Sequence, residues 1–323
     1  MGIVAVAATL SSNVSAKSAG LDRGVLQLQV VLDRLGFTPG VIDGKSGRSL
    51  AKALRGFQTA NGLDVTGTID TATKKALEQY LGAPATVEVQ IGPGDLAGPF
   101  VNPIPKDPAD QAKLNCLCYR TVMEKLAERF HTTPATLLAL NSPDTPLKAG
   151  EPIVVPAILP SSRDYPSVTD AAWRATLSDL NVDPNQPQAD RIVVDKSDGV
   201  LRVMAGDKLV AQFPATMGSE HDPLPVGRWT IKGAAYNPTF HYNPDLFWDA
   251  KSTDEKQKLP AGPNGPVGVI WIDLSKPHYG IHGTPEPQNI GRTESHGCIR
   301  LTNWDAARLS LMVKPGMPAI FQE

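Results

Sequence analysis

The 323-residue chain has a composition that excludes several classes of protein. Hydrophobic residues make up 41% and charged residues 20%, and the mean hydropathy is −0.17, which excludes wholesale disorder and a polytopic membrane protein. The 31 basic and 33 acidic residues give a net charge of −2, so no bulk positive charge favours nucleic acid as a partner. The length suits two or three domains, and 28 Gly and 29 Pro residues predict many turns and linkers.

The first residues of the chain resemble an export signal. Ile3 to Leu10 is a short apolar run, and Val14-Ser15-Ala16 has the small residues at which signal peptidases cut. The run is much shorter than the about 20 apolar residues that a membrane span needs. We therefore expect residues 1–16 to be a signal peptide and the mature chain to begin near Lys17, without an integral membrane segment. The expected location is the periplasm or cell wall, and the alternative is an apolar terminus without function.

Residues 21–82 predict a small three-helix bundle. Apolar side chains recur at helical spacing in three stretches that turn-rich loops separate. Gly36 ends the first stretch, and Asp70 can cap the third helix. No nucleophile is paired with a base here, so periodicity alone supports only a structural module. The apolar positions are Leu26, Val30, Val31 and Leu35, then Leu50, Ala53, Leu54 and Phe57, then Ala72, Ala76, Leu77 and Tyr80.

The turns of this segment are more specific than its helices. Four patterns occur in order, namely Leu35-Gly36-Phe37, Gly40-x-Ile42-Asp43-Gly44-x-x-Gly47, Phe57-Gln58-x-x-Asn61-Gly62-Leu63 and Gly67-x-Ile69-Asp70. On these patterns the segment resembles the peptidoglycan-binding domain family. The resemblance implies a non-catalytic anchor that holds an enzyme on the cell-wall polymer. Taken singly, Asp43, Gly44 and Asn61 are equally compatible with turn residues that backbone geometry requires.

Residues 83–112 predict a linker, because Pro and Gly recur throughout the segment. In residues 113–160, two helical stripes are followed by a turn and a β-rich run that ends at Val155-Pro156. The order strand, helix, helix, strand resembles a LysM domain, although the usual Gly-Asp-Thr turn is missing. The resemblance implies a small α/β module that binds glycan, and the alternative is a spacer of the same fold. Residues 161–187 are expected to be a connector.

Cys116 and Cys118 lie in the predicted middle module as a Cys-x-Cys pair. A disulfide between them would close a very small ring under strain. A metal site would need a second pair of ligands, and the sequence offers none nearby. We therefore expect both cysteines to be small buried apolar residues.

Residues 188–323 predict a mostly β domain, built as a small curved sheet or sandwich. Short β-rich runs are separated by turns, and no helical pattern of useful length occurs before Trp304 to Met312. Residues 236–266 form a long loop with aromatic, Pro and Gly residues, which is typical of a lid or a substrate wall. The chain as a whole is therefore expected to be a multidomain α+β protein.

The third cysteine has the surroundings of a catalytic nucleophile. A thiolate held by an imidazole is strong enough to attack an amide or ester carbonyl near neutral pH. His282 precedes Cys298 by 16 residues, and a strand end can return it to hydrogen-bond reach. His296 is the alternative base; we favour His282, with His296 lining the pocket or assisting proton transfer. Gly283 and Gly297 flank the two histidines and allow backbone N–H groups to face a developing oxyanion.

Ordered motifs in this region resemble the L,D-transpeptidase (YkuD-like) catalytic domain over about residues 190–322. The motifs are Ile281-His282-Gly283-Thr284, Ile290-Gly291 and Ser295-His296-Gly297-Cys298-Ile299-Arg300-Leu301. The resemblance implies that Cys298 is the nucleophile and that His282 is the base, oriented by the backbone carbonyl of Gly283. It also implies acylation of the cysteine by carbapenem-type β-lactams. The oxyanion is then expected to face the backbone N–H groups of Cys298 and Gly297.

Arg300, Ser295 and Tyr279 are the candidate residues for substrate binding. Arg300 can hold a substrate carboxylate or, equally, fix its own loop through hydrogen bonds to backbone carbonyls.

A zinc site is the alternative role of His282, His296 and Cys298, with a fourth ligand from His221, His241 or His278. Zinc would occupy the thiolate, and no two of these ligands show the close spacing of a helical metal motif. We therefore expect neither a metal nor another cofactor, and we expect His221, His241 and His278 to be loop or surface residues.

The expected function is that of an exported peptidoglycan L,D-transpeptidase, in cell-wall biogenesis and cell shape. It would transfer an acyl group from a tetrapeptide stem to an amine and release D-alanine. A diamino-acid side chain as acceptor would give a 3–3 cross-link, and a protein amine would tether a protein to the wall. Water as acceptor would make the chain an L,D-carboxypeptidase, and loss of catalysis would leave a peptidoglycan-binding protein. The sequence leaves the acceptor, the third stem residue and the oligomeric state open.

Overall fold

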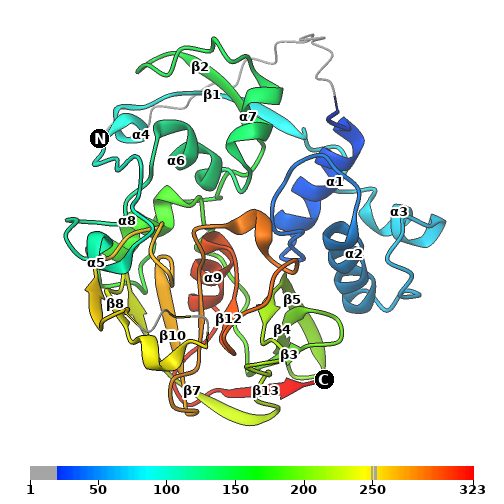
Figure 1. Ribbon diagram of the computed structural model, residues 1–323. Helices are drawn as coiled ribbons and strands as arrows, with labels where there is room; N and C mark the ends of the chain where they lie inside the picture. Colours follow the sequence, from blue (N-terminus) through cyan, green and yellow to red (C-terminus); the bar gives the residue numbers. More distant parts are fainter. Residues whose placement is uncertain (1–19, 249, 251–252) are drawn as a thin grey trace.

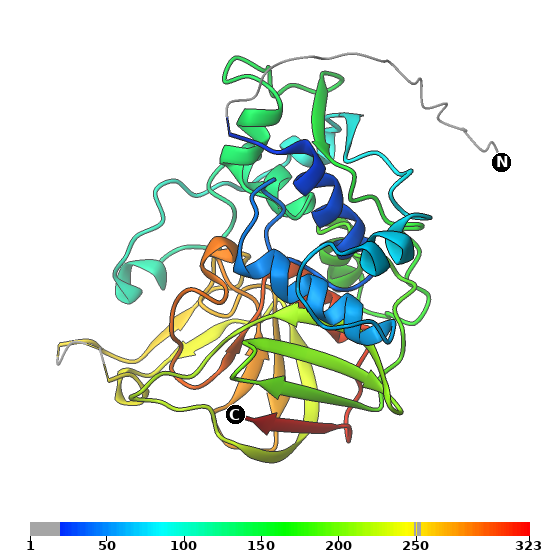
Figure 2. The same cartoon turned by 90° about the vertical axis from the view of Figure 1, so that its right-hand side faces the viewer.

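The computed structural model describes residues 20–248, 250 and 253–323 (Figure 1). The predicted signal peptide, residues 1–16, and the expected mature start at Lys17 lie outside them. Two views at right angles show the helical first half of the chain lying over the β-rich second half (Figure 2). No helix in the described part of the chain is long and apolar enough to cross a membrane.

The N-terminal module (residues 21–82) contains the three predicted helices, α1 (Arg23–Arg34), α2 (Arg48–Ala60) and α3 (Thr71–Leu77). Asp22 caps α1 by accepting a hydrogen bond from the Gly24 amide at 2.8 Å. Asp70 caps α3 in the same way, accepting from the Thr73 amide at 2.7 Å. The core of the module includes Leu209 of the catalytic domain, so the bundle packs directly on the sheet.

The middle module corrects the predicted linker. Within residues 83–112, β1 (Thr86–Gln90) pairs antiparallel with β2 (Pro152–Pro156). Val87 and Val89 pack on the core that the two predicted helices build. The alternation of these valines favours a strand. The surrounding Pro and Gly residues form turns and begin short helices. The helices are α4 (Pro93–Leu96), α5 (Pro108–Gln111), α6 (Val122–Arg129) and α7 (Pro134–Leu140).

Residues 97–121, which we call the strap, connect α4 to α6 and carry α5. At the end of the strap Leu117 is fully buried. Its amide donates to the Ala261 carbonyl, and its carbonyl accepts from the Asn264 amide, both at 2.9 Å. Gly262 approaches so closely that a Cβ there would lie 2.2 Å from the Leu117 oxygen. The strap is therefore fastened to the catalytic domain.

The two cysteines that flank Leu117 correct a second prediction, because Cys116 and Cys118 form a disulfide. Both are half-buried rather than core residues. Their Cα atoms lie 5.2 Å apart, within the usual range of disulfides. The segment is irregular rather than a strand, and Leu117 turns inward between the two cysteines. The prediction of two free apolar cysteines rested on the small size of the ring, and the chain closes this ring here.

The catalytic domain is built on one nine-stranded sheet with the strand order β5-β4-β3-β13-β7-β10-β11-β12-β6, in agreement with the predicted β-rich domain. Its strands are β3 (Arg191–Asp195), β4 (Val200–Ala205), β5 (Lys208–Pro214), β6 (Thr216–Met217), β7 (Gly227–Tyr236), β10 (Ile270–Leu274), β11 (Gly280–His282), β12 (Ile299–Arg300) and β13 (Pro318–Gln322). Within the predicted lid, β8 (Phe240–Tyr242) and β9 (Gln257–Leu259) form a separate pair. Short 3-10 helices occupy Pro244–Leu246 and Pro287–Asn289.

Two helices complete the core of the catalytic domain. Helix α9 (Asn303–Ser310) falls where the sequence predicts a helix. Helix α8 (Ala171–Asp179) lies in the segment predicted as a connector, residues 161–187. Its Trp173 and Leu177 are buried in the same core as Trp304 of α9. Residues 161–187 are therefore part of the catalytic core rather than a simple connector.

A buried polar cluster at α9, which we call the junction, joins the three modules. Asp33 of α1 accepts from His131 Nδ1 at 3.0 Å, and Arg308 of α9 donates to the Asp33 carbonyl at 2.9 Å. The other ring nitrogen of His131 lies 2.9 Å from the Leu180 carbonyl. Both ring nitrogens thus face oxygen acceptors. The junction fixes the modules relative to one another through opposite charges.

Candidate active site

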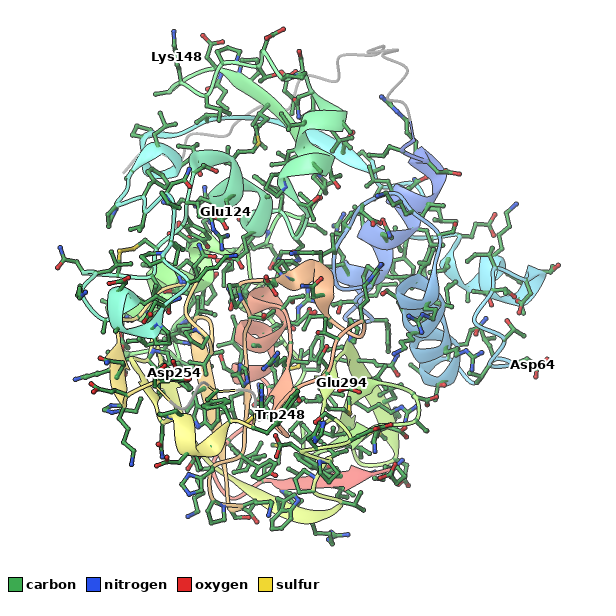
Figure 3. All side chains as sticks on the ribbon, in the orientation of Figure 1. Asp64, Glu124, Lys148, Trp248, Asp254 and Glu294 are labelled. Atoms are coloured by element: carbon green, nitrogen blue, oxygen red, sulfur yellow. A yellow bond between two sulfur atoms is a disulfide. The ribbon has the colours of Figure 1, made fainter. Side chains whose placement is uncertain are left out.

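The sheet and its covering loops border a cavity of about 600 Å³ that contains five of the predicted site residues. These residues are Cys298, His282, His296, Arg300 and Tyr279. The facing walls come from the predicted lid, which includes Trp248 (Figure 3), and from Pro108 and Gln111 of the strap. Apolar and aromatic walls around a few polar groups are typical of a small-molecule or peptide site.

The pairing of two short strands brings the two catalytic motifs together. Strands β11 and β12 are parallel, with Ile281 opposite Ile299 and His282 opposite Arg300. Cys298 directly precedes β12, and its sulfur is hydrogen-bonded by the backbone of Gly280 in β11. The chain between His282 and Cys298, residues 283–297, therefore forms a connection that returns to the same edge of the sheet.

His282 is held as a neutral imidazole with one nitrogen available. It is buried and stacks on Trp271 with ring centroids 5.5 Å apart. Its Nδ1 lies 2.7 Å from the Gly283 carbonyl, which can only accept, so Nδ1 carries the proton and Nε2 the lone pair. Burial lowers the pKa of His282 to about 3, Arg300 acts in the same direction, and the Gly283 bond opposes both. The imidazole is therefore uncharged near neutral pH.

Cys298 is a thiol in the same neutral state. Burial raises its pKa above the ordinary value, and Asp222 adds to this effect. The Gly280 hydrogen bond and Arg300 act in the opposite direction without reversing the shift. The Sγ atom lies 3.6 Å from the His278 carbonyl, which accepts from the S–H group. The resting pair is thus thiol and imidazole rather than thiolate and imidazolium.

Two glycines next to the catalytic residues are required by close approach. A Cβ at Gly283 would lie 2.0 Å from the Asn303 side-chain oxygen. Gly297 has a φ of 89°, and a Cβ there would lie 2.6 Å from the Tyr279 ring. The positive φ lets the chain turn sharply just before Cys298. This turn orients the backbone N–H groups of Cys298 and Gly297, which are predicted to face the oxyanion.

Ser295 has a different place from the predicted one. It is buried and does not line the cavity. Its hydroxyl accepts from the Gly218 amide and donates to the Cys298 carbonyl, both at 2.7 Å. Both bonds are internal, and together they position the turn that carries the nucleophile. The predicted substrate-binding role of Ser295 stays a prediction.

The two candidate bases have different surroundings. His296 packs against aromatic residues of the lid, with Phe247 edge-on at 4.9 Å and Trp248 tilted at 5.9 Å between ring centroids. His282 instead lies within the sheet, beside Arg300 in the strand register. His296 therefore forms a wall of the cavity between the nucleophile loop and the lid.

Arg300 and Tyr279 line the cavity near the nucleophile. Arg300 Nη1 donates to the Glu294 carbonyl at 3.5 Å, the loop-fixing contact that the sequence allows. Its charge reaches both catalytic groups, since it lowers the pKa of Cys298 and of His282. The ring of Tyr279 covers Gly297, and Lys276 Nζ lies 4.8 Å from its centroid. Burial and Asp222 raise the pKa of the Tyr279 hydroxyl.

Sequence reasoning missed Asp222 and Trp271, which also line the cavity. The Asp222 Oδ2 atom is buried and has no hydrogen-bond partner among the residues that the structure describes. Asp222 lies in an irregular loop before a proline, where a single carboxylate carries no distinctive sequence signal. Trp271 supplies the face on which His282 stacks, and the alternating β10 sequence identifies it only as a strand residue.

The histidines named for the zinc alternative lie in different surroundings. In the described part of the chain, no group of three or more His, Cys, Asp or Glu side chains is arranged to hold a metal ion. His221 stacks on Trp248 with ring centroids 4.4 Å apart, whereas His241 and His278 line the cavity.

Comparison with known proteins places two domains on the chain. Residues 189–320 match the L,D-transpeptidase catalytic domain (YkuD), and residues 22–77 match the "Putative peptidoglycan binding domain". The "Putative L,D-transpeptidase YkuD" of Bacillus licheniformis is 29% identical over 197 residues, which cover 60% of this chain and 89% of that protein. The protein of the same name from Bacillus subtilis is 27% identical over 195 residues, with the same coverage of 60% and 89%.

Among solved structures, the "L,D-transpeptidase from Mycobacterium smegmatis" is 26% identical, with a TM-score of 0.34. The match covers 41% of this chain and 58% of that one, so this chain spans less than two thirds of that structure's length.

The chain therefore carries an L,D-transpeptidase catalytic domain and is an enzyme. An N-terminal peptidoglycan-binding domain accompanies the catalytic domain. This pair of domains places the enzyme at the cell wall, outside the cytoplasm. Neither of the two family matches extends into residues 78–188, so neither supports the predicted LysM-like module.

Proposed function

We propose that this enzyme is an exported transpeptidase that transfers the tripeptide acyl group of a peptidoglycan tetrapeptide stem from the terminal D-alanine to an amine. One observation carries the proposal. The cavity unites a cysteine thiol with a neutral imidazole that donates from Nδ1 to the Gly283 carbonyl, and places Arg300 beside both. A nucleophile, a base and a group that orients the base are the parts that acyl transfer needs.

The neutral resting pair determines how the thiol is activated. Because burial opposes charge on both groups, the proton stays on Cys298 until the substrate arrives. As the sulfur attacks the carbonyl carbon, its proton passes to Nε2 of His282. The Gly283 carbonyl, already bonded to Nδ1, stabilises the imidazolium while it exists.

Acylation is completed when D-alanine leaves. The attacked carbonyl joins the L-centre of the third stem residue to the terminal D-alanine. Its oxygen becomes an oxyanion that faces the backbone N–H groups of Cys298 and Gly297. His282 then returns its proton to the nitrogen of D-alanine as the C–N bond breaks, which leaves a thioester on Cys298.

Asp222 supports an amine rather than water as the second substrate. The ammonium group of a diamino acid would pair with the carboxylate, whose Oδ2 has no partner among the described residues. When the deprotonated amine attacks the thioester, its nitrogen becomes positive and the carboxylate stabilises this charge. His282 takes the extra proton, the C–S bond breaks, and the sulfur leaves and is reprotonated. Water gains no such advantage from Asp222.

The two accessory modules are proposed to hold the enzyme on its polymer. The N-terminal module would act as the anchor. The order β1, α6, α7, β2 supports a LysM-like middle module whose first strand comes from Thr86–Gln90. A protein amine tethered to the wall remains an alternative acceptor, and hydrolysis an alternative outcome.

A single incubation tests the reaction. The full chain with purified disaccharide-tetrapeptide is expected to lose D-alanine and to form cross-linked dimers, measured by mass spectrometry. Tripeptide monomer alone would indicate an L,D-carboxypeptidase, and no change in a folded enzyme would contradict the proposal. Asp222→Asn is expected to reduce dimers about tenfold while tripeptide release persists, as the loss of one charged pairing predicts. Asp207→Asn, in an exposed turn, is the matched control.

A carbapenem provides an independent test of the nucleophile. The wild-type chain is expected to gain the mass of one carbapenem, and Cys298→Ala is expected to gain none. An adduct that persists in Cys298→Ala would contradict the assignment.

A further inference from the structure

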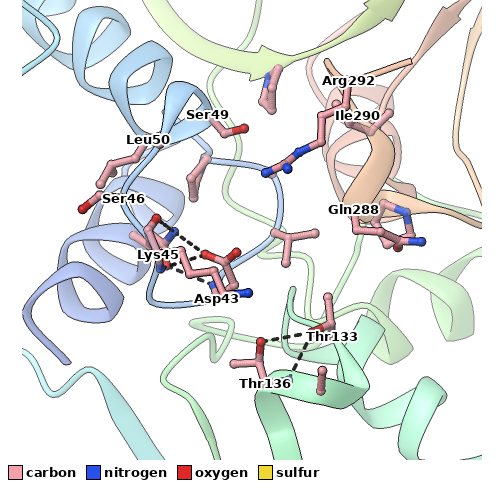
Figure 4. Close-up of a pocket in the computed structure, with 18 of the residues that line it drawn as sticks. Asp43, Lys45, Ser46, Ser49, Leu50, Thr133, Thr136, Gln288, Ile290 and Arg292 are labelled. Atoms are coloured by element: carbon pink, nitrogen blue, oxygen red, sulfur yellow. Dashed lines mark hydrogen bonds between the residues drawn. The ribbon is translucent and has the colours of Figure 1, made fainter. Parts of the chain in front are cut away.

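A second hollow lies where the three modules meet, away from the active-site cavity (Figure 4). Its volume is about 760 Å³, within the range of ligand-binding clefts. Its walls are residues 39–50 of the N-terminal module, residues 133–139 at α7 and residues 287–292 of the catalytic domain. We call this hollow the three-module cleft.

Polar and apolar residues share the lining of the three-module cleft about equally, and no aromatic side chain of the described residues lines it. The uncharged polar members are Gln29, Ser46, Ser49, Thr133, Thr136, Gln288 and Asn289. The Ser49 hydroxyl and the Arg292 guanidinium extend from opposite walls into the space between them (Figure 4). Asp43, Lys45 and Arg292 supply charges of both signs, so the cleft does not attract a polyanion.

The walls of the cleft are held in place before any ligand arrives. The buried Gln29 accepts from the amides of Asp43 and Gly44 at 3.0 and 2.7 Å. Its amide nitrogen donates to the Asp43 carboxylate at 3.0 Å. On the facing wall, the hydroxyls of Thr133 and Thr136 lie 3.0 Å apart and bond to each other. A preformed site loses less conformational entropy when it binds.

One wall of the cleft is fastened to the strand beside the nucleophile. The Gly291 amide donates to the Thr216 hydroxyl at 2.8 Å. Thr216 lies in β6, opposite Arg300 of β12, and Cys298 directly precedes β12. A ligand in the three-module cleft is therefore held in a fixed relation to the catalytic cysteine.

We propose that the three-module cleft binds the N-acetylated sugar strand of peptidoglycan, while a stem from the same polymer reaches Cys298. The identity of the polymer rests on the proposed function. Sugar hydroxyl and acetamide groups match the Ser, Thr, Gln and Asn side chains, and the free carboxylate of a muramic acid that carries no stem matches Arg292. The cleft would thus couple anchoring to catalysis, because all three modules contact one strand.

Direct binding tests the cleft without catalysis. The probe is a peptide-free tetrasaccharide of alternating N-acetylglucosamine and N-acetylmuramic acid, titrated calorimetrically into the full chain. Ser46→Trp fills the cleft from an exposed position and is expected to weaken binding at least tenfold. Arg292→Ala is expected to weaken it about tenfold, the loss of one charge-assisted hydrogen bond. Thr71→Trp and Arg228→Ala, exposed residues outside the cleft, are the matched controls and are expected to bind like wild type.

Measurements of turnover distinguish a failure of the cleft proposal from a failure of the proposed reaction. Ser46→Trp is expected to raise KM for disaccharide-tetrapeptide and to leave its kcat and the turnover of free tetrapeptide unchanged. No binding of the tetrasaccharide to wild type, or equal binding by Ser46→Trp, would contradict the proposal that the three-module cleft binds the sugar strand. If wild type turns over neither substrate and Ser46→Trp still loses tetrasaccharide binding, the result supports sugar binding by the cleft and contradicts the proposed reaction.

Discussion

The active-site cavity and the junction of the three modules both bury ionisable groups, but with opposite results. In the cavity, burial and Arg300 keep His282 neutral by lowering its pKa to about 3. At the junction, burial also disfavours the charge of Asp33, yet His131 and Arg308 lower the pKa of its carboxyl below the ordinary value. Asp33 therefore stays ionised where His282 stays uncharged.

Asp33 is charged and His282 is neutral because different groups surround them. The junction supplies opposite charges, so its ions stabilise the folded arrangement as long as all partners are present. The cavity gives His282 the Gly283 carbonyl, the tryptophan face and the like charge of Arg300, so a charge forms there only during the reaction. Substitutions in the cavity should therefore affect rate, and substitutions in the junction should affect stability.

The largest expected effect comes from the base. His282→Ala should lower the rate of acylation by about 10³-fold, because a positioned general base contributes this order of magnitude. His296→Ala removes only a wall of the cavity and should cost about tenfold or less. Rates of D-alanine release from disaccharide-tetrapeptide, measured on variants of equal thermal stability, would show the ranking. The reverse ranking would assign the base to His296.

Removal of a charge from the junction should destabilise the fold. Asp33→Ala leaves His131 and Arg308 facing each other without the carboxylate and should cost about 3–5 kcal/mol in the free energy of unfolding. Urea unfolding measures this loss. Asp64→Ala, an exposed aspartate in the same module, should change the free energy by less than about 0.5 kcal/mol. Equal effects of the two substitutions would contradict the role of the junction.

Asp305 of α9, which lies beside the junction, should also make stability depend on pH. Burial and the nearby Asp33 raise the pKa of Asp305 to about 7, while Arg308 and His131 oppose the shift. Between about pH 4 and pH 7 the unfolded chain loses this proton before the folded chain does, so stability falls as pH rises. Asp305→Asn should remove this part of the slope in urea unfolding at pH 5 and pH 7. An unchanged slope would show that Asp305 does not titrate in this window.

The smallest effect is expected at Ser295. Ser295→Ala removes two internal hydrogen bonds and should cost about 1–3 kcal/mol of stability. Because the nucleophile turn loosens, kcat should fall while KM stays unchanged. A rise in KM with unchanged kcat would support the substrate-binding role that the sequence suggests.

The nucleophile and its partner were accessible to sequence reasoning because each lies in a short motif whose chemistry is local. Cys298 and His282 needed only one further inference, that a strand end returns the histidine to the cysteine, and the parallel pairing of β11 with β12 supplies it. Ser295 belongs to the same motif, but its role depends on Gly218, 77 residues away. No local pattern predicts such a contact.

The missed strand and disulfide have a common physical cause. Composition averaged over residues 83–112 emphasises Pro and Gly, and so conceals the five residues of β1. The pairing of β1 with β2 joins residues about 65 apart, which no periodicity reveals. Cys116 and Cys118 meet because Leu117 turns inward against Ala261 and Asn264, a contact of the tertiary fold.

The most direct test of the central claim is the mass of the acyl-enzyme. Wild type and Cys298→Ala, mixed briefly with disaccharide-tetrapeptide and quenched in acid, would be compared by intact mass spectrometry and peptide mapping. The account predicts a covalent disaccharide-tripeptide adduct on Cys298 in wild type and none in the variant. An adduct on another residue, or one that persists in Cys298→Ala, would contradict it.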